Sequence, residues 1–195
     1  SVYLGMDVHI GSDTVLYPGV ILEGSTVIGS RCTLGHNAHI VDSTLGDDCQ
    51  VTASTIESST LEDGVSVGPY SHLRGGTRLG RGVHLGNYAE VKASTLGAGV
   101  KMGHFGYIGD ATVGEETNIG AGTITANFDG KKKNPTTIGE KAFIGVDTSL
   151  VAPVEVGDGA RTGAGSVVTK DVPPGSLAVG MPARVIKTGL DEAED

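Results

Sequence analysis

Two cations and one histidine have residue types and a spacing that could support chemistry. Arg74 and Lys92 lie eighteen positions apart, and His104 follows in the block Gly103-His-Phe-Gly-Tyr-Ile-Gly-Asp110. Three consecutive lysines, 131 to 133, come next in a chain whose formal net charge is −9. Paired cations can bind an anion such as a phosphate, and an imidazole can exchange a proton near neutral pH. Whether these groups act together depends on the elements that position them.

Those elements are indicated by a repeat of six residues. Aliphatic residues, called guide residues here, recur at about this period from Ile10 to Val168, and 25 of 26 guides are apolar, Thr162 being the exception. A small residue, such as Cys32 or Ala89, often stands four positions after a guide. A period of six fits neither an amphipathic helix nor a simple alternating strand. Hexapeptide repeats are typical of a parallel β-helix, so the sequence predicts an all-β solenoid of roughly nine triangular coils.

The period also predicts which outward side chains are neighbours. Residues three hexads apart stack at the strand spacing of about 4.8 Å. Face A is defined by the guides Leu85, Met102, Ile119, Ile144 and Thr162, and face B by Leu73, Val91 and Ile108. Arg74 and Lys92 each follow a face B guide, with Glu90 and Tyr107 beside them. At ~5 Å and an effective dielectric near 20, two cations repel by roughly 3 kcal/mol, so their stacking predicts an anion site.

A single interruption of the repeat falls on the same face. Residues 126–137 replace one turn in the face B hexad that begins at Thr125. The three lysines of this inserted loop, residues 131–133, leave the solenoid on the side of Arg74 and Lys92. An insertion in a solenoid is often functional, although a solvated loop is the simpler interpretation of a charge run.

A column of small residues begins at His104 on face A. Ala121, Val146 and Ala164 occupy the same hexad position on successive coils. No long side chain stands in this column for about three coil spacings, or roughly 14 Å. The sequence therefore predicts a shallow groove along the helix axis that could hold a slender thioester arm.

The remaining histidines and cysteines are interpreted as structural. We expect His9, His36, His39, His72 and His84 to share no column with His104, and no spacing predicts a zinc triad. Cys32 and Cys49 fall at equivalent inward positions on adjacent coils, close enough to raise the question of a disulfide. Reduced thiols that fill small-residue positions are favoured in a cytoplasmic protein.

Composition excludes several classes of protein. Glycine is the commonest residue, at 32, aromatic residues make up 4% of the chain and tryptophan is absent, so a core of large interdigitating side chains is hard to build. The negative charge argues against general binding to nucleic acid or to an anionic membrane. No apolar run approaches ~18 residues, and the first residues lack the pattern of a signal peptide. These features predict a soluble, cytoplasmic protein.

Several blocks resemble one bacterial family closely. They are Leu73-Arg-Gly-Gly, Gly86-Asn-Tyr-Ala-Glu-Val-Lys92, Gly103-His-Phe-Gly-Tyr-Ile-Gly-Asp110, Asn118-Ile-Gly-Ala-Gly-Thr-Ile-Thr-Ala-Asn-Phe-Asp-Gly130 and Gly145-Val-Asp-Thr. The chain resembles, over nearly its whole length, the acetyltransferase domain of the bifunctional N-acetylglucosamine-1-phosphate uridyltransferase and glucosamine-1-phosphate acetyltransferase. The resemblance implies a left-handed β-helix, acetyl-CoA as donor, glucosamine-1-phosphate as acceptor, and a homotrimer with sites between subunits. The implied product leads to UDP-N-acetylglucosamine for peptidoglycan and lipopolysaccharide.

The resemblance also assigns roles residue by residue. His104 matches the general base of the family. Its sugar-phosphate ligands are matched by Arg74, Lys92, Tyr107, Asn118 and Lys133, beside which Glu90 is a further candidate from its column. Its acetyl-CoA contacts are matched by Ala121, Asn127, Phe128, Val146 and Ala164. Phe128 stands where tyrosine is common and Val146 where serine is common. The family's arginine near the chain end aligns with Met181, so Arg184 is a candidate for a CoA phosphate.

The expected organisation is a hexapeptide-repeat domain over residues 1–172 and a C-terminal extension with an acidic tail over residues 173–195. The resemblance implies a uridyltransferase domain before residue 1, and we expect the chain to be a C-terminal fragment without it. Magnesium would belong to that domain, and no metal is expected in this one. Three alternatives stay open: another hexapeptide-repeat acyltransferase, a γ-class carbonic anhydrase with three histidines on zinc, and a non-enzymatic trimerisation scaffold.

Overall fold

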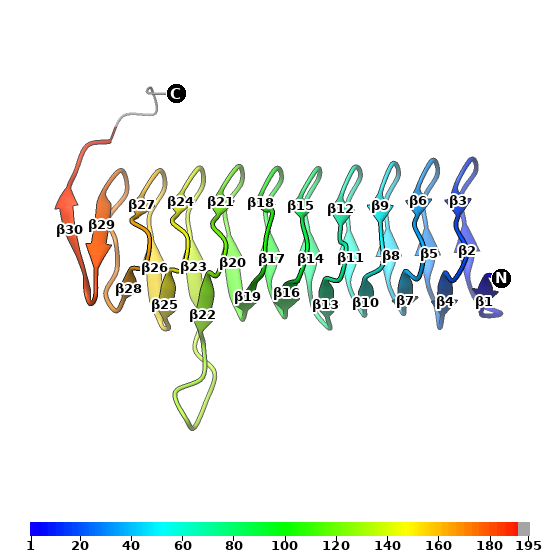
Figure 1. Cartoon of the computed structure of the whole chain (residues 1–195), viewed down its shortest axis with the longest axis horizontal. Helices are drawn as coiled ribbons and strands as arrows, with labels where there is room; N and C mark the ends of the chain where they lie inside the picture. Colours follow the sequence, from blue (N-terminus) through cyan, green and yellow to red (C-terminus); the bar gives the residue numbers. More distant parts are fainter. Residues whose placement is uncertain (191–195) are drawn as a thin grey trace.

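The computed structural model describes residues 1–190, which form a long three-sided prism of stacked coils (Figure 1). Successive coils add one short strand to each of three sheets of ten, nine and eleven strands, and all pairings but the last are parallel. The prediction of an all-β, left-handed parallel β-helix is confirmed. About ten coils are present rather than nine, because β1 (Tyr3–Leu4) precedes the first guide and β29 (Leu177–Gly180) follows the last.

From β1 to β28, successive strands fall on the three faces in turn, and β29 and β30 then both lie on face A. Face B contains β1, β4 (Ile21–Glu23), β7 (His39–Val41), β10 (Thr55–Glu57), β13 (His72–Arg74), β16 (Ala89–Lys92), β19 (Gly106–Gly109), β22 (Ile124–Ala126), β25 (Ser149–Val151) and β28 (Val167–Val168). The third face, face C, contains β2 (His9–Ile10), β5 (Val27–Ile28), β8 (Thr44–Leu45), β11 (Thr60–Leu61), β14 (Arg78–Leu79), β17 (Thr95–Leu96), β20 (Ala111–Val113), β23 (Thr136–Ile138) and β26 (Val154–Val156). Face A contains β3 (Val15–Leu16), β6 (Thr33–Leu34), β9 (Gln50–Val51), β12 (Ser66–Val67), β15 (His84–Leu85), β18 (Lys101–Met102), β21 (Asn118–Ile119), β24 (Phe143–Ile144), β27 (Arg161–Thr162), β29 and β30 (Ala183–Lys187).

The core consists of the guide residues, which point inward and stack on one another. Leu34, Ile56 and Leu85 are among the many guides that are fully buried. Burying one such side chain stabilises a fold by about 1.5–3 kcal/mol, so the stack replaces the aromatic core that the composition lacks. The small residues four positions after a guide are buried too, and they include Cys32 and Cys49, which are both free thiols.

Two guide positions in the C-terminal half hold threonine and bond to the backbone: Thr162, and Thr125, which begins the interrupted hexad and is not among the 26 guides counted above. The Thr125 hydroxyl accepts a hydrogen bond from the Gly109 amide at 2.8 Å, and the Thr162 hydroxyl accepts one from the Gly145 amide at 2.9 Å. Because these buried hydroxyls have partners, they do not carry the cost of an unsatisfied polar group.

The corners of the prism are made by residues in the left-handed backbone region. Between faces B and C, Asp42 and Asp110 have φ angles of 47° and 52°. Aspartate tolerates this conformation better than most residues, since its short side chain can bond locally. Between faces A and B, the corner residues Tyr70 and Tyr88 stack with ring centroids 5.4 Å apart.

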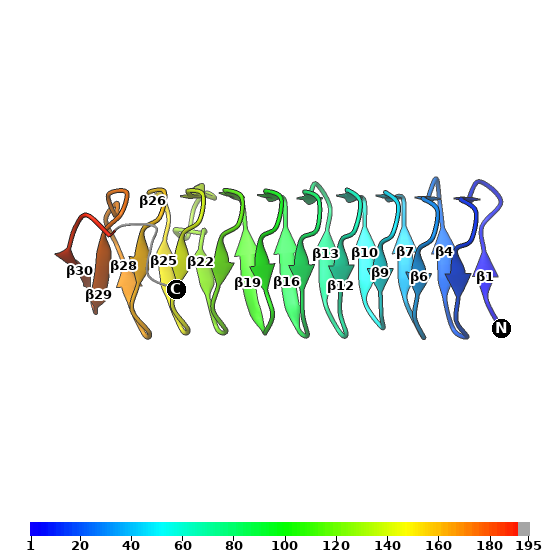
Figure 2. The same ribbon diagram turned by 90° about the horizontal axis from the view of Figure 1, so that it is seen from above.

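Two departures from the regular coil lie in the C-terminal half. The inserted loop leaves the body between β22 and β23, as Figure 1 shows, and Figure 2 gives the prism at right angles to that view. Parallel stacking continues past residue 172 through β29, and β30 then pairs with β29 in the antiparallel sense. The acidic tail, residues 191–195, lies outside the described residues.

Candidate active site

The predicted cation column is present on face B. Arg74 lies opposite Lys92 in the register of β13 and β16, and Glu90 lies opposite Tyr107 in the register of β16 and β19. Arg74 Nη1 contacts Glu90 Oε1 at 2.9 Å, which raises the pKa of Arg74. Part of the positive charge is therefore offset from within the same face.

A third cation joins this column from the inserted loop. Lys133 Nζ lies 3.4 Å from Asp110 Oδ2, at the corner that follows β19. Contact with Lys133, together with the charge of Arg74, lowers the pKa of Lys92. The prediction that the loop leaves on the side of Arg74 and Lys92 is thus confirmed, and the ammonium groups of Lys92 and Lys133 interact unfavourably.

The start of the loop is held against Tyr107. The Asn127 side chain, almost wholly buried, donates hydrogen bonds to the Tyr107 hydroxyl at 3.3 Å and to Asp110 Oδ2 at 2.5 Å. Gly109 makes this packing possible, because a Cβ atom there would overlap the Tyr107 hydroxyl. Tyr107, Asn127, Lys133 and Asp110 consequently form one connected cluster beside Lys92.

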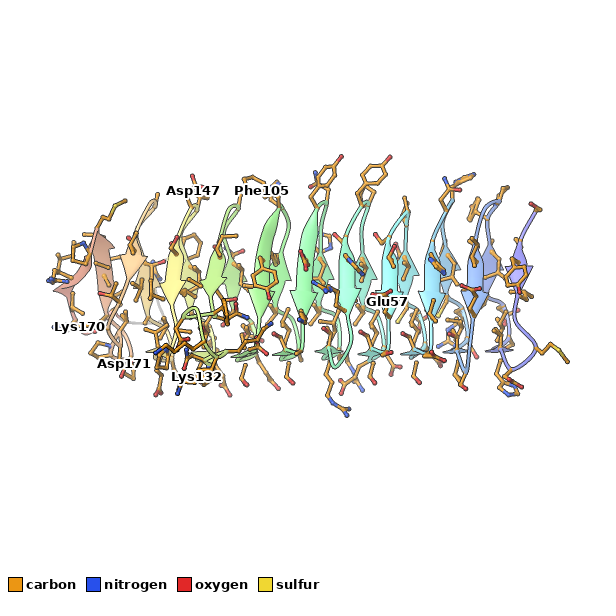
Figure 3. All side chains as sticks on the ribbon, turned by 90° about the horizontal axis from the view of Figure 1, so that it is seen from below. Glu57, Phe105, Lys132, Asp147, Lys170 and Asp171 are labelled. Atoms are coloured by element: carbon orange, nitrogen blue, oxygen red, sulfur yellow. The ribbon has the colours of Figure 1, made fainter. Side chains whose placement is uncertain are left out.

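The predicted groove is present at the side of face A. His104 and Asn118 line it together with the small residues Ala121, Val146 and Ala164, and its volume is about 640 Å³. Because glycines 120, 145 and 163 also line the groove, backbone atoms are accessible along it. Phe105 and Asp147, each next in the chain to a groove residue, project along one long edge of the prism in Figure 3.

The candidate residues thus fall into two sets on one chain. Face B and its loop bring together Arg74, Glu90, Lys92, Tyr107, Asn127 and Lys133. The groove brings together His104, Asn118, Ala121, Val146 and Ala164. Phe128, in the loop, is exposed and bridges to Lys133, so it lies with the first set. Arg184 lies on β30 beside a separate small cavity that also involves Lys170.

One expectation about the histidines is wrong. The register of face A runs from Leu34 through Val51, Val67 and Leu85 to Met102. His36 and His104 each stand two positions after a guide of this series, so they share a column four coils apart. Several hexads between them have five residues rather than six, so the separation in sequence is no multiple of eighteen.

Asp110 is the functional candidate that the sequence reasoning missed. It ends the block Gly103-His-Phe-Gly-Tyr-Ile-Gly-Asp110 and stands one coil before the inserted loop, and both facts are visible in the sequence. Its contacts with the loop depend on how the insertion folds back, which the period does not determine.

Two features of residues 1–190 bear on metal binding and on membrane insertion. Within this range, no three side chains of the types His, Cys, Asp and Glu lie close enough together to hold a metal ion. Over the same residues, no helix is long and apolar enough to cross a membrane.

Several curated relatives share about half of their aligned residues with this chain. The Bifunctional protein GlmU of Fervidobacterium nodosum is 53% identical over 189 residues, and that of Thermotoga petrophila is 51% identical over 187 residues. The protein of the same name from Streptococcus agalactiae serotype V is 48% identical over 189 residues. These alignments cover 96 to 97% of this chain and 41 to 42% of the relatives. The chain therefore spans about two fifths of the length of the curated relatives it matches.

Solved structures share the fold at much lower identity. A UDP-N-acetylglucosamine acyltransferase from Arabidopsis superposes with a TM-score of 0.82 at 15% identity, covering 95% of this chain and 72% of that chain. The enzyme of that name from Campylobacter jejuni gives a TM-score of 0.80 at 17% identity, covering 88% and 74%.

A family model gives the broadest assignment. The model described as bacterial transferase hexapeptide (six repeats) matches residues 7–42, 58–93 and 135–170, which together make up more than half of the chain. These stretches follow the hexads that build all three faces. The chain belongs to the bacterial transferase hexapeptide family.

Proposed function

We propose that this chain transfers an acetyl group from acetyl-CoA to the amine of glucosamine-1-phosphate, giving N-acetylglucosamine-1-phosphate. The similarity of about half of all residues to proteins named Bifunctional protein GlmU, over nearly the whole chain, carries this proposal. The product would enter UDP-N-acetylglucosamine synthesis for peptidoglycan and lipopolysaccharide in the cytoplasm. Uridyl transfer, and the magnesium it needs, are assigned to the part of the relatives that this chain does not span.

The cation cluster is the proposed site for the sugar phosphate. Arg74, Lys92 and Lys133 supply charge-assisted hydrogen bonds, which are stronger than neutral ones and suit a dianionic group. The unfavourable contact of Lys92 with Lys133 supports this role, because a bound phosphate would relieve it. Glu90, Tyr107 and Asn118 are proposed to orient the sugar ring and its amine.

The groove is the proposed site for acetyl-CoA. Its small side chains leave room for the thioester arm, and the backbone amides of Ala121, Val146 and Ala164 are proposed to donate hydrogen bonds to it. Since these contacts are with the backbone, valine at position 146 is compatible with them. Asn127, Phe128 and Arg184 are proposed as further contacts with acetyl-CoA, Arg184 with a phosphate of CoA.

His104 is the proposed general base. It lies exposed at the end of the groove, where its imidazole can take the proton from the acceptor ammonium or during attack. The amine nitrogen then attacks the thioester carbonyl, the carbon–sulfur bond breaks, and CoA leaves as the thiol after accepting a proton. Backbone amides of the groove, including that of Ala121, are proposed to stabilise the oxyanion. No covalent enzyme intermediate is required.

The two sets of residues favour a homotrimer in which each site is shared. Face B with its loop carries the phosphate ligands, whereas the groove lies along face A, so a single prism presents them on adjacent sides. We propose that face B of one subunit meets the groove of its neighbour. Sedimentation analysis tests this arrangement, and a stable monomer with full activity contradicts it.

The decisive experiment is a thiol-release assay with acetyl-CoA and glucosamine-1-phosphate. We expect release that depends on both substrates and mass-spectrometric detection of N-acetylglucosamine-1-phosphate. Glucosamine without its phosphate is the matched acceptor control, and it should react far more slowly. Binding of acetyl-CoA without any transfer to the sugar phosphate would show that this acceptor is wrong, and absence of CoA binding would show that the reaction class is wrong.

A further inference from the structure

Asp110 connects both ends of the inserted loop to the body of the prism. Its carboxylate oxygen Oδ2 accepts the hydrogen bond from Asn127 at 2.5 Å and lies 3.4 Å from Lys133 Nζ. Its backbone carbonyl accepts a hydrogen bond from the Thr136 amide at 3.2 Å. The three partners stand at the start, on the returning arm and at the end of the loop.

The loop itself is a hairpin with internal bonds. The Asn134 amide donates to the Asn127 carbonyl at 2.7 Å, and the Asn134 side chain donates to Asp129 Oδ2 at 2.9 Å. Asp129 Oδ1 accepts the amides of Lys131 and Lys132, both at 2.8 Å. These bonds shape the hairpin, but they do not fix its direction relative to face B.

The positive charge of Lys92 explains why Lys133 needs a counter-charge to hold it in place. Lys133 stands beside Lys92, so the like charges of two ammonium groups oppose each other in one small region. Contact with Lys92 and the nearby carboxylate of Asp110 raise the pKa of Lys133, and that carboxylate holds the ammonium group of Lys133 on the body of the prism. Asp110 is half-buried, which makes this attraction less screened than on an open surface.

We propose that Asp110 is the positioning residue that orients the inserted loop and places Lys133 beside Lys92, so that the two ammonium groups together meet the phosphate of the acceptor. The identity of that acceptor rests on the proposed function. Asp110 acts through Lys133 and Asn127 and does not touch the substrate. The competing arrangement, in which Asp110 occupies the place of the phosphate and must be displaced, predicts effects of opposite sign.

The chain contains a matched control for this residue. Asp42 occupies the same corner between faces B and C, with a similar φ angle of 47°. Its carboxylate accepts the Ser25 amide at 2.9 Å and has no inserted loop above it. A substitution of Asp42 therefore repeats the change at the corner without the change at the loop.

Trypsin measures the position of the loop without reference to any activity, because the loop carries three consecutive lysines. Cleavage of a transiently open segment follows the population of its open form, so Asp110→Ala should raise the rate of cutting after residues 131–133 by about tenfold or more. Asp42→Ala should leave that rate unchanged. Circular dichroism of each variant checks that the solenoid is intact. If Asp110→Ala does not fold, Asp110→Asn, which keeps an acceptor for Asn127, tests the proposal through the KM of the acceptor instead.

Kinetics measure the consequence for the acceptor. Loss of a charge-assisted contact corresponds to about 10- to 150-fold, so Asp110→Ala and Lys133→Ala should each raise the KM for glucosamine-1-phosphate by that order, with kcat changed only a few-fold. The double variant should be little worse than either single variant, because both remove the same contact. Asp110→Asn should resist trypsin like the wild type and still show a raised KM.

Three results overturn the proposal. They are unchanged cleavage in Asp110→Ala, a lowered acceptor KM in Asp110→Asn, and full additivity in the double variant. If the wild-type protein does not use glucosamine-1-phosphate at all, the proposed function fails, whereas the trypsin comparison still decides whether Asp110 holds the loop.

Discussion

The N-terminal region of the prism, residues 1–72, and the region that carries the site, residues 73–168, share one core and differ on the outside. In the first region, Arg31 is paired with Asp47 at 3.1 Å and Asp48 at 2.8 Å. In the second, Arg74, Lys92 and Lys133 lie together, with Glu90 in contact with Arg74 and Asp110 in contact with Lys133. The guides hold the coil together in both regions, so outward positions are free to differ, and they are where the chemistry resides.

The same contrast separates two histidines in one column. His36 lies against the ring of Tyr17, with centroids 5.1 Å apart, in the first region. His104 opens onto the groove that Ala121 and Val146 extend. The position of a histidine in the hexad is therefore not enough to make it a general base. The side chains of the neighbouring columns determine which groups it can contact.

The largest expected effect is a difference in turnover between variants of His104 and of His36. His104→Ala should lower turnover by roughly 10²–10⁴-fold, the usual contribution of a general base, whereas His36→Ala should change it no more than a few-fold. Both side chains point outward, so thermal unfolding should hardly move in either variant. Turnover, unfolding and acetyl-CoA binding are measured side by side. If His104→Ala keeps turnover within a few-fold of the wild type, the reaction depends on positioning alone.

The next comparison sets Arg74 against Arg31. Arg74→Ala and Lys92→Ala should each weaken binding of the sugar phosphate by about 1.5–3 kcal/mol and leave acetyl-CoA nearly unaffected. Arg31→Ala removes an exposed ion pair, which contributes about 0–1 kcal/mol to stability, and should change neither substrate. Isothermal titration with each substrate separates the cases. Equal weakening of both substrates by Arg74→Ala would mean that the column is not the phosphate site.

The period of six explains what could be predicted from the sequence. It determines the register, and with it the stacking of Arg74 on Lys92 and the small-residue column above His104. It does not determine the path of the insertion, so the contact of Lys133 with Asp110 could not be found in this way. The shared column of His36 and His104 was missed because five-residue hexads between them break the count, although the guides themselves could have revealed it.

A pH dependence sharpens the comparison within the cation column. The pKa of Lys92 is lowered by Lys133, so Lys92 loses its charge at a lower pH than an ordinary lysine. Binding of the acceptor phosphate should therefore weaken as pH rises through that pKa, on the alkaline side. Lys133→Ala removes the largest cause of the shift and should move this limb of the kcat/KM profile to higher pH. Lys132→Ala, at the tip of the loop, should leave the limb where it is. A limb that moves to lower pH in Lys133→Ala contradicts the assigned contact.

The smallest expected effect is on the free energy of unfolding. It concerns the core, where the region that carries the site has threonine at two guide positions, Thr125 and Thr162. Thr125→Val keeps the shape but leaves the buried Gly109 amide without its acceptor, which should cost about 1–3 kcal/mol. Val51→Thr, the reverse change in the first region, should cost a similar amount, because the neighbouring amides already bond to backbone carbonyls and the new hydroxyl has no partner. Chemical denaturation of both variants tests the pair.

The two threonine guides should also separate the two substrates. Gly109 lies against the Tyr107 hydroxyl and next to Asp110, so Thr125→Val should raise the KM of the acceptor a few-fold. Thr162 bonds the amide of Gly145, which precedes Val146 in the groove, so Thr162→Val should instead raise the KM of acetyl-CoA. If both variants affect the same substrate, the hydroxyls act only on overall stability. If Thr125→Val affects only the acceptor and Thr162→Val only acetyl-CoA, each buried threonine links the core to one substrate site. The hydroxyl would then be kept at that guide position because it fixes the backbone of the neighbouring strand, which holds the site residues in place.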